Sequence, residues 1–301
     1  MRSPVDHYSD AWLSFELRHP VDRLRLLAGM VPEDLYSVRR VEINRKVRDI
    51  SNPCDELKAV QRSIRERLLL PIPLSPIVYS DVPGHSAAQN AERHLHQANV
   101  GSADIRDCYN SMTNAMVFRV FRHTLRLGDS LADLLTGLTT SRGHLPHGAP
   151  TSGALANLIL SPIDVELERI AVELDLKITR YVDNIDFSGQ RTRHAFLPIV
   201  ALIQSLGFAV KRRKVFNASR QRVQIVTGRT VSGRVLRLPR AKRANVRANV
   251  HEVLCRRRDG LPIQDKQINR LRGRLNYLRT QGHPKEARDL ATRLAAVGIN
   301  I

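Results

Sequence analysis

The chain has 301 residues, of which 42% are hydrophobic and 26% charged, as in ordinary globular proteins, and this composition excludes wholesale disorder. It has no apolar run long enough to cross a membrane and no signal-peptide pattern, so we expect a cytoplasmic protein with no membrane association. Its three cysteines lack both the C-x-x-C pair of a zinc module and the even count of a disulfide framework. The formal net charge of +19 calls for an anionic partner, most commonly a phosphate backbone.

Hydrophobic spacing and turn residues predict an α+β body that carries a helical, basic C-terminal piece. Along the first half of the chain we expect a helix over 20–30, a strand pair over 38–50, a helix over 56–70 capped by Asp55, a proline-rich connector over 71–76, a helix over 84–96, a strand end at 103–105, and helices over 113–127 and 131–138. Along the second half we expect a helix over 153–174, a strand-turn-strand unit over 177–188 with Asp183 and Asn184 at its turn, a helix over 194–206, a hairpin over 222–238 around Ser232 and Gly233, and helices over 266–279 and 284–296.

The positive charge is concentrated in one stretch of the sequence. Between Lys211 and Arg258 there are 16 lysines and arginines and one acid, Glu252. A solubilising surface does not need so one-sided a segment, so we predict that it contacts nucleic acid. Each phosphate that it neutralises would steepen the salt dependence of binding by roughly one log unit per log unit of salt.

Carboxylates occur where predicted strands end. Asp104 closes one strand, and Asp183 stands at the tip of a predicted hairpin. Two such acids can converge on Mg²⁺, and a pair of Mg²⁺ ions can activate an attacking hydroxyl and stabilise a leaving oxygen in phosphoryl transfer. The spacing alone leaves another reading open, because Asp-Asn is also ordinary turn chemistry and Asp104 could cap a helix.

Four segments together resemble the palm of a reverse transcriptase. Asp104, followed five residues later by Tyr109, resembles the first catalytic motif, and residues 145–152, L-P-H-G-A-P-T-S, are similar to the family's L-P-Q-G-A-P-T-S. Residues 181–184, Y-V-D-N, resemble its Y-x-D-D, and Gly207-Phe208 with Lys214 resembles the motif that follows. Upstream, residues 48–61 resemble the fingers segment.

Two shorter matches point to the retron branch of that family. Asn90 to His94 fits its N-A-x-x-H segment, and Val226 to Gly228 fits its V-T-G segment. All the motifs occur in family order from about Val38 to Leu294. Other defence-associated or diversity-generating reverse transcriptases remain as alternatives within the family.

The resemblance implies a right-hand polymerase fold of fingers, palm and thumb. The corresponding divisions are an N-terminal helical extension over 1–35, fingers over 36–100, a palm over 101–235 and a basic helical thumb over 236–301. It also implies an RNA-directed DNA polymerase that binds a cognate structured non-coding RNA, copies part of it into DNA from deoxynucleoside triphosphates, and works with an effector protein in phage defence.

The resemblance assigns roles to individual residues. Two Mg²⁺ ions would be held by Asp104, Asp183, Asn184 and the carbonyl of Ile105, and Lys214 would protonate the leaving pyrophosphate. Residues that would bind the nucleotide are Arg48, Tyr109, His147 and Gly148. Residues that would bind the RNA are Asn90, His94, Val226, Thr227, Gly228, Arg240, Lys242 and Arg243.

The sequence departs from the family pattern at Asn184, which stands where Y-x-D-D has its second aspartate. An amide can coordinate a cation but carries no charge, so affinity for Mg²⁺ should fall. Asp186 lies two residues further along the same strand, hence on the same face, and could partly compensate. The competing hypothesis is a catalytically silent RNA-binding scaffold that regulates a partner; a simple basic structural protein of a ribonucleoprotein is disfavoured by the ordered motifs.

Overall fold

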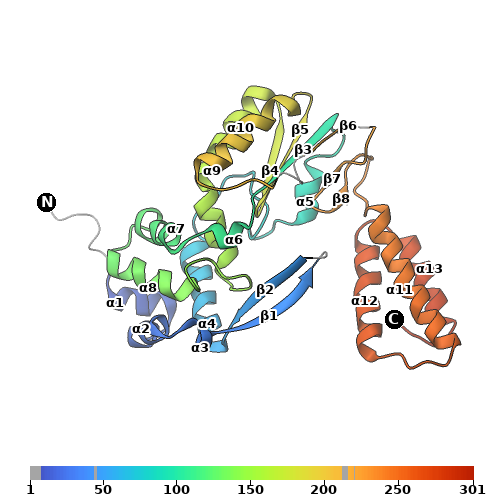
Figure 1. The fold of residues 1–301 in the computed structure, drawn as a ribbon, viewed down its shortest axis with the longest axis horizontal. Coiled ribbons are helices and arrows are strands. Elements are labelled where there is room, and N and C mark those ends of the chain that lie inside the picture. Colours follow the sequence, from blue (N-terminus) through green and yellow to red (C-terminus); the bar gives the residue numbers. More distant parts are fainter. Residues whose placement is uncertain (1–7, 44–45, 212–215, 220) are drawn as a thin grey trace.

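The centre of the molecule is an antiparallel sheet. The structure is a computed structural model that describes residues 8–43, 46–211, 216–219 and 221–301 (Figure 1). The sheet has the strand order β4-β5-β3-β6, formed by Lys177–Tyr181, Asn184–Gly189, Asn99–Asp104 and Phe216–Ser219. Its register places Ser102 opposite Asp186 and Asp104 opposite Asn184. The strands predicted around 103–105 and 177–188 are therefore confirmed.

The two faces of the sheet differ in chemistry because side chains alternate along each strand. Ala103, Ile185 and Phe187 belong to the main apolar core, and helices α9 (Ser152–Leu174) and α10 (Thr192–Ser205) cover that face (Figure 1). Of the alternate positions, Ser102 and Asp186 are polar yet buried. They lie toward α5 (Ala87–Glu92) and the small hairpin of β7 (Ile225–Val226) and β8 (Arg229–Thr230).

The N-terminal third combines helices with a projecting hairpin. Its elements are α1 (Asp10–Leu17), α2 (Val21–Gly29), α3 (Pro32–Leu35), β1 (Tyr36–Ile43), β2 (Lys46–Pro53), α4 (Asp55–Ile64) and a π-helical turn η2 (Arg65–Leu69). Apolar residues at helical spacing bury one face of α4, as predicted. The expected cap was wrong: Cys54 occupies the N-cap position, and Asp55 is the first helical residue, where its charge still suits the helix N-terminus.

The middle of the chain connects the sheet with the N-terminal helices, because α8 packs against α2 and α4. It contains α6 (Cys108–Ser111), α7 (Asn114–Arg119), a π-helical turn η3 (Val120–Thr124) and α8 (Asp129–Thr139). The proline-rich connector runs beside β4, where the Arg180 amide donates to the Ile77 carbonyl at 2.7 Å and the Tyr79 amide to the Arg180 carbonyl at 2.9 Å. Of the helix expected over 84–96, only α5 forms.

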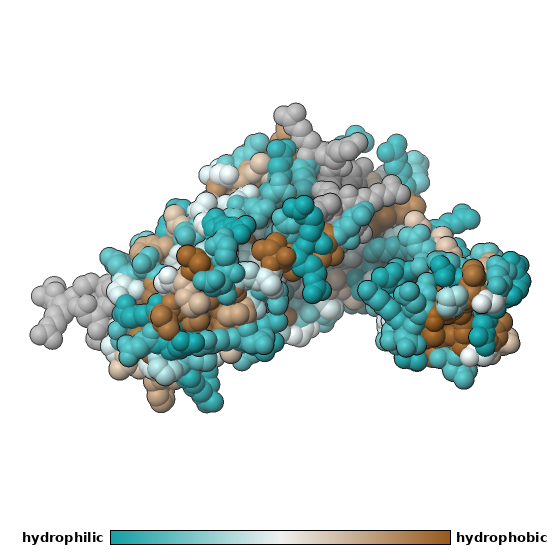
Figure 2. All heavy atoms as spheres, turned by 60° about the horizontal axis from the view of Figure 1, so that its bottom comes forward, coloured by the Kyte–Doolittle hydropathy of each residue, from teal (hydrophilic) through white to brown (hydrophobic). Residues whose placement is uncertain are grey.

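The C-terminal helices are α11 (Arg240–Arg258), α12 (Asp265–Thr280) and α13 (Pro284–Ala295), and they share a separate apolar cluster (Figure 1). The last two confirm the prediction. The first was missed, because its polar composition hides an apolar stripe of Val246, Val250 and Val253 at helical spacing. Figure 2 shows apolar atoms reaching the surface of these helices within a mainly hydrophilic exterior.

The turns of the two predicted hairpins differ in detail from the structure. The β4–β5 turn consists of Val182 and Asp183, while Asn184 already pairs in β5, one residue earlier than expected. The β7–β8 hairpin turns at Thr227-Gly228, and the predicted reversal around Ser232-Gly233 is present as a single antiparallel bridge between Thr230 and Arg237. A left-handed φ, at Val182 and at both residues of the second turn, is what permits these tight reversals.

Candidate active site

The ends of two neighbouring strands bring Asp104 and Asp183 together. Asp104 is the last residue of β3, and Asp183 lies in the turn that leads into β5. The Ile105 amide donates to the Asp183 carbonyl at 2.9 Å, and the Lys211 amide donates to the Asp104 carbonyl at 2.8 Å. These backbone bonds fix the relative position of the predicted metal ligands.

Asp104 is a buried carboxylate with a cationic neighbour. Its exposed fraction is 1%, and its Oδ1 lies 2.7 Å from the Lys211 ammonium. Burial and the Asp183 and Asp104 charges raise the pKa of the adjacent Cys108 thiol to about 12, so this thiol stays protonated. The sequence analysis did not single out Lys211, although a lysine directly after the apolar run at 208–210 was a usable signal.

The side chain of Asn184 is already hydrogen-bonded, which reduces its availability as a metal ligand. Its side-chain oxygen accepts a hydrogen bond from Ser102 Oγ at 3.0 Å. Asp186 lies on the same face, as period-two geometry predicted, and accepts from Asn90 Nδ2 at 3.5 Å. The Asp186 carboxylate is 1% exposed. That Asp186 replaces the negative charge missing at Asn184 stays a prediction.

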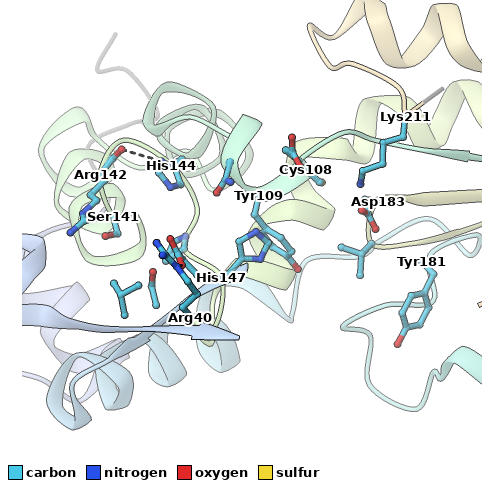
Figure 3. Close-up of a pocket in the computed structure, with 17 residues that line it drawn as sticks. Arg40, Cys108, Tyr109, Ser141, Arg142, His144, His147, Tyr181, Asp183 and Lys211 are labelled. Atoms are coloured by element: carbon cyan, nitrogen blue, oxygen red, sulfur yellow. Dashed lines mark hydrogen bonds and ion pairs between the residues drawn. The ribbon is translucent and has the colours of Figure 1, made fainter. Parts of the chain in front are cut away.

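A cavity of about 740 Å³ opens between the β1–β2 hairpin, α6, the loop before α9 and the β4–β5 turn. Figure 3 shows Tyr109, His147 and Asp183 on its wall, with the Lys211 side chain pointing toward Asp183. The Tyr109 and His147 rings meet edge to face, with centroids 4.8 Å apart. Burial raises the pKa of the Tyr109 phenol, which keeps it neutral. Arg40, which the sequence analysis missed, also lines the cavity.

The loop that carries His147 and Gly148 docks against β2. The Ser51 amide donates to the His147 carbonyl at 2.7 Å. Gly148 has a φ of +112°, and a Cβ on it would lie 3.0 Å from the Ser51 carbonyl oxygen. The observed reason for glycine is therefore this contact with β2. Lys214 and the side chain of Arg48 lie outside the described part of the chain.

Three of the residues predicted to bind RNA are buried, which corrects that prediction. His94 is 0% exposed and its ring nitrogens lie 2.7 Å from Ser188 Oγ and 2.8 Å from Thr179 Oγ1; burial lowers its pKa to about 3. Asn90 is equally buried against Asp186. Val226 lies in a small apolar cluster. These residues join α5 and the β7–β8 hairpin to the sheet and cannot contact RNA directly.

The rest of the predicted RNA-binding set lies nearer the surface. Thr227 Oγ1 donates to the Ala87 carbonyl at 2.7 Å, and the Gly228 carbonyl accepts from Lys242 Nζ at 3.2 Å, so this turn bridges α5 and α11. Arg240 and Lys242 are exposed at the start of α11. Arg243 instead donates to Glu286 of α13 at 2.7 Å and ties two C-terminal helices together.

The donor set at Asp104 and Asp183 consists of oxygen atoms, which suit Mg²⁺. This ion binds proteins through one or two carboxylates and completes its shell with water and substrate phosphates. Among the residues that the structure describes, no group of three or more histidine, cysteine or acidic side chains is arranged to hold a metal. The residues present thus fit a hard cation that a substrate helps to bind, with Lys211 as a competitor for Asp104.

Comparison with known proteins gives relatives for most of the chain, although no protein-family model matches it. It is 28% identical to the retron Ec86 reverse transcriptase of Escherichia coli, over 88% of this chain and 82% of that protein. It is 32% identical to the retron Mx65 reverse transcriptase of Myxococcus xanthus, over 82% of this chain and 61% of that protein. None of the helices in the described ranges has the length and apolarity of a membrane span.

Among solved structures, telomerase from Candida albicans, determined with a fragment of telomeric RNA, has a TM-score of 0.52 and 10% identity, covering 96% of this chain and 58% of that chain. At this identity the likeness concerns the fold alone, and it confirms the predicted α+β, polymerase-like architecture. The similarity to several retron proteins extends over most of the sequence. These matches, at 23–32% identity over most of the chain, support a retron-type reverse transcriptase.

Proposed function

We propose that the protein is an RNA-directed DNA polymerase that copies part of a cognate structured RNA into DNA. The observation that carries this proposal is the placement of Asp104, at the end of β3, next to the β4–β5 turn that holds Asp183, beside a cavity lined by Tyr109 and His147. The similarity to retron reverse transcriptases supports the same reaction. Deoxynucleoside triphosphates are the substrates, and the cognate non-coding RNA serves as both template and binding partner.

Asp104 and Asp183 are proposed to hold two Mg²⁺ ions together with the Asn184 amide and the Ile105 carbonyl. When bound, Mg²⁺ supplies charge neutralisation for the phosphates and acidifies the attacking hydroxyl. The protein's own contribution is to orient the two carboxylates through the Ile105–Asp183 backbone bond. Lys214 is proposed as the acid for the leaving group.

The cavity wall is proposed to select and orient the nucleotide. Tyr109 would lie under the sugar and reject a 2′-hydroxyl by collision, and its edge contact with His147 holds the ring in place. Arg48 would hold the triphosphate. Gly148 keeps the His147 loop seated on β2, so that the loop wall stays at a fixed distance from the hairpin.

The C-terminal helices are proposed to grip the nucleic-acid duplex. Residues 36–100 would act as fingers, 101–235 as palm and 236–301 as thumb. Arg240 and Lys242 are exposed basic residues next to the turn at Thr227-Gly228, and an A-form duplex is recognised mainly through its backbone and shape. A cytoplasmic location, an effector protein and a role in phage defence are further parts of this proposal.

A second candidate is an RNA-binding scaffold with little or no catalysis. Two features favour it: Asn184 removes a negative charge from the site, and Lys211 adds a positive one at 2.7 Å from Asp104. Both changes weaken attraction for Mg²⁺.

The two functions are separated by primer extension on an RNA template with Mg²⁺ and deoxynucleotides, comparing the natural chain with Asp183→Ala. Extension that this substitution abolishes supports the polymerase. An absence of extension, on a generic template and on RNA that co-purifies with the protein, supports the scaffold. An Asp183→Asn variant is the matched control for folding, since it keeps the side-chain shape.

A further inference from the structure

The turn between β4 and β5 holds a strained residue directly before Asp183. Val182 has a φ of 57°, in the left-handed region that β-branched residues avoid. A backbone of this kind persists only where the surrounding structure fixes it. The turn therefore depends on groups that hold Val182 in place.

Two buried side chains bond to both backbone groups of Val182. The Val182 amide donates to Ser80 Oγ at 2.7 Å, and the Val182 carbonyl accepts from Arg180 Nη1 at 3.2 Å. Ser80 is 4% exposed and Arg180 is 0% exposed. The strained residue is thus held from inside the protein, with no dependence on solvent.

Helix α9 fixes Arg180 in turn. The Arg180 Nε and Nη2 donate to the two Asp164 carboxylate oxygens at 2.6 and 2.7 Å, and Nη1 also donates to Asn157 Oδ1 at 3.0 Å. Asn157 Nδ2 donates to the Ser80 carbonyl at 2.7 Å, which closes the network. We call Ser80, Asn157, Asp164 and Arg180 the turn clamp.

The turn clamp acts on the site through the backbone. Asp183 follows Val182, and its carbonyl accepts the Ile105 amide next to Asp104. A change in the φ of Val182 would rotate Asp183 relative to Asp104. None of the four clamp residues is among those that line the 740 Å³ cavity, although Val182 is, so the clamp reaches the cavity only through the backbone of Val182.

We propose that the turn clamp positions Asp183 against Asp104, with Arg180 as its central positioning residue. A buried ion pair contributes little net stability compared with well-packed apolar residues of similar volume. Arg180 and Ser80 hydrogen-bond to the backbone of Val182, which apolar side chains could not do. This gives the buried Arg180–Asp164 ion pair a role beyond stability. This inference rests on the proposed polymerase function and identifies what holds its metal ligands in register.

The test replaces both charges of the clamp at once, in Arg180→Met/Asp164→Leu, so that no buried charge is left unpaired. We expect kcat for primer extension to fall about 10- to 100-fold, as a small misplacement of a reacting group does. KM for the deoxynucleotide should change little, because the cavity wall is intact. The matched control is Arg169→Met/Glu166→Leu, an exposed pair on α9, which should change neither constant.

Rescue separates positioning from general stability. Glycine adopts a left-handed φ without strain, so Val182→Gly added to the double variant should restore most of kcat without restoring the buried ion pair. Amide hydrogen exchange gives a readout that needs no activity: the Val182 amide should exchange faster in the double variant. If the double variant fails to fold, Ser80→Ala takes its place, because it introduces no charge. This variant should also speed exchange of the Val182 amide.

Unchanged kcat in a folded double variant, or a failure of Val182→Gly to restore it, would overturn the proposal. Unchanged exchange at Val182 in both the double variant and Ser80→Ala would do the same. If the natural chain extends no primer, the polymerase proposal fails, while hydrogen exchange still decides whether the clamp holds the turn.

Discussion

Replacing Lys211 by alanine is expected to strengthen binding of a divalent cation at the site. The ammonium lies 2.7 Å from Asp104 Oδ1, and a cation that uses this oxygen has to displace it. Two unit charges at this distance attract by about 6 kcal/mol at an effective dielectric constant of 20. Desolvation offsets much of this energy, and hydrogen bonds between charged groups contribute a net of about 1.5–3 kcal/mol. Because 1.4 kcal/mol is a factor of ten, the Kd for Mn²⁺ should fall roughly 10- to 100-fold.

The same substitution should lower the free energy of unfolding when no metal is present. Asp104 is 1% exposed, and without Lys211 it becomes a buried carboxylate that has lost this counter-ion. The added cation should then stabilise the variant more than it stabilises the natural chain. This opposite response of stability, with and without metal, distinguishes competition for Asp104 from a general loosening of the fold.

Isothermal titration with Mn²⁺ measures the Kd, and thermal unfolding with and without Mn²⁺ measures the stability. Lys177→Ala is the matched control, since it removes the same charge from an exposed position at the far end of β4. A Kd that is unchanged or weaker in Lys211→Ala, beside an unchanged control, would refute the reasoning that the ammonium and the metal compete for one carboxylate.

Three further changes have defined outcomes. Asn184→Asp should bind Mn²⁺ more tightly and extend primers faster, because it places a carboxylate opposite Asp104; titration and extension rates that match the natural chain would contradict this. His94, with a pKa lowered to about 3, makes stability fall as pH drops below about 6.5, by about 2 kcal/mol at pH 5, so urea unfolding of His94→Gln should lack that slope. Gly101→Ala should cost about 1–3 kcal/mol in urea unfolding, because its Cβ would meet the Phe187 ring at 2.2 Å, and an unchanged midpoint would count against the packing described.

The sequence was sufficient for features that depend on local pattern. Strand alternation identified the segments that carry Asp104 and Asp183, and the two-residue period placed Asn184 and Asp186 on one face, as the register bears out. Motif order also pointed to the family. These successes share a cause, because each relies on residues that are close together in the chain.

Burial of polar residues could not be predicted in the same way. His94 matched a motif taken to contact RNA, but its partners are Ser188 and Thr179, about 90 residues further along the chain. The residues near His94 in the sequence do not indicate that the hydroxyls of Ser188 and Thr179 will contact its ring. Lys211 follows an apolar run, which was a usable signal, but its partner Asp104 lies 107 residues earlier in the chain. The apolar stripe of α11 was present in the sequence but hidden by surrounding charge.

The separate apolar cluster of the C-terminal helices has a consequence for how stable these helices are on their own. A unit of about 60 residues buries only about 60% of the surface that its unfolded chain exposes, which leaves it marginally stable alone. Its contacts with the rest of the molecule include single polar bonds, such as Arg229 Nε to Gln281 Oε1 at 2.8 Å. A polyanion that binds only the folded helices would supply the missing stability by mass action. The folded fraction of these basic helices would then rise with the amount of bound RNA, so that RNA binding and folding of this unit would be coupled.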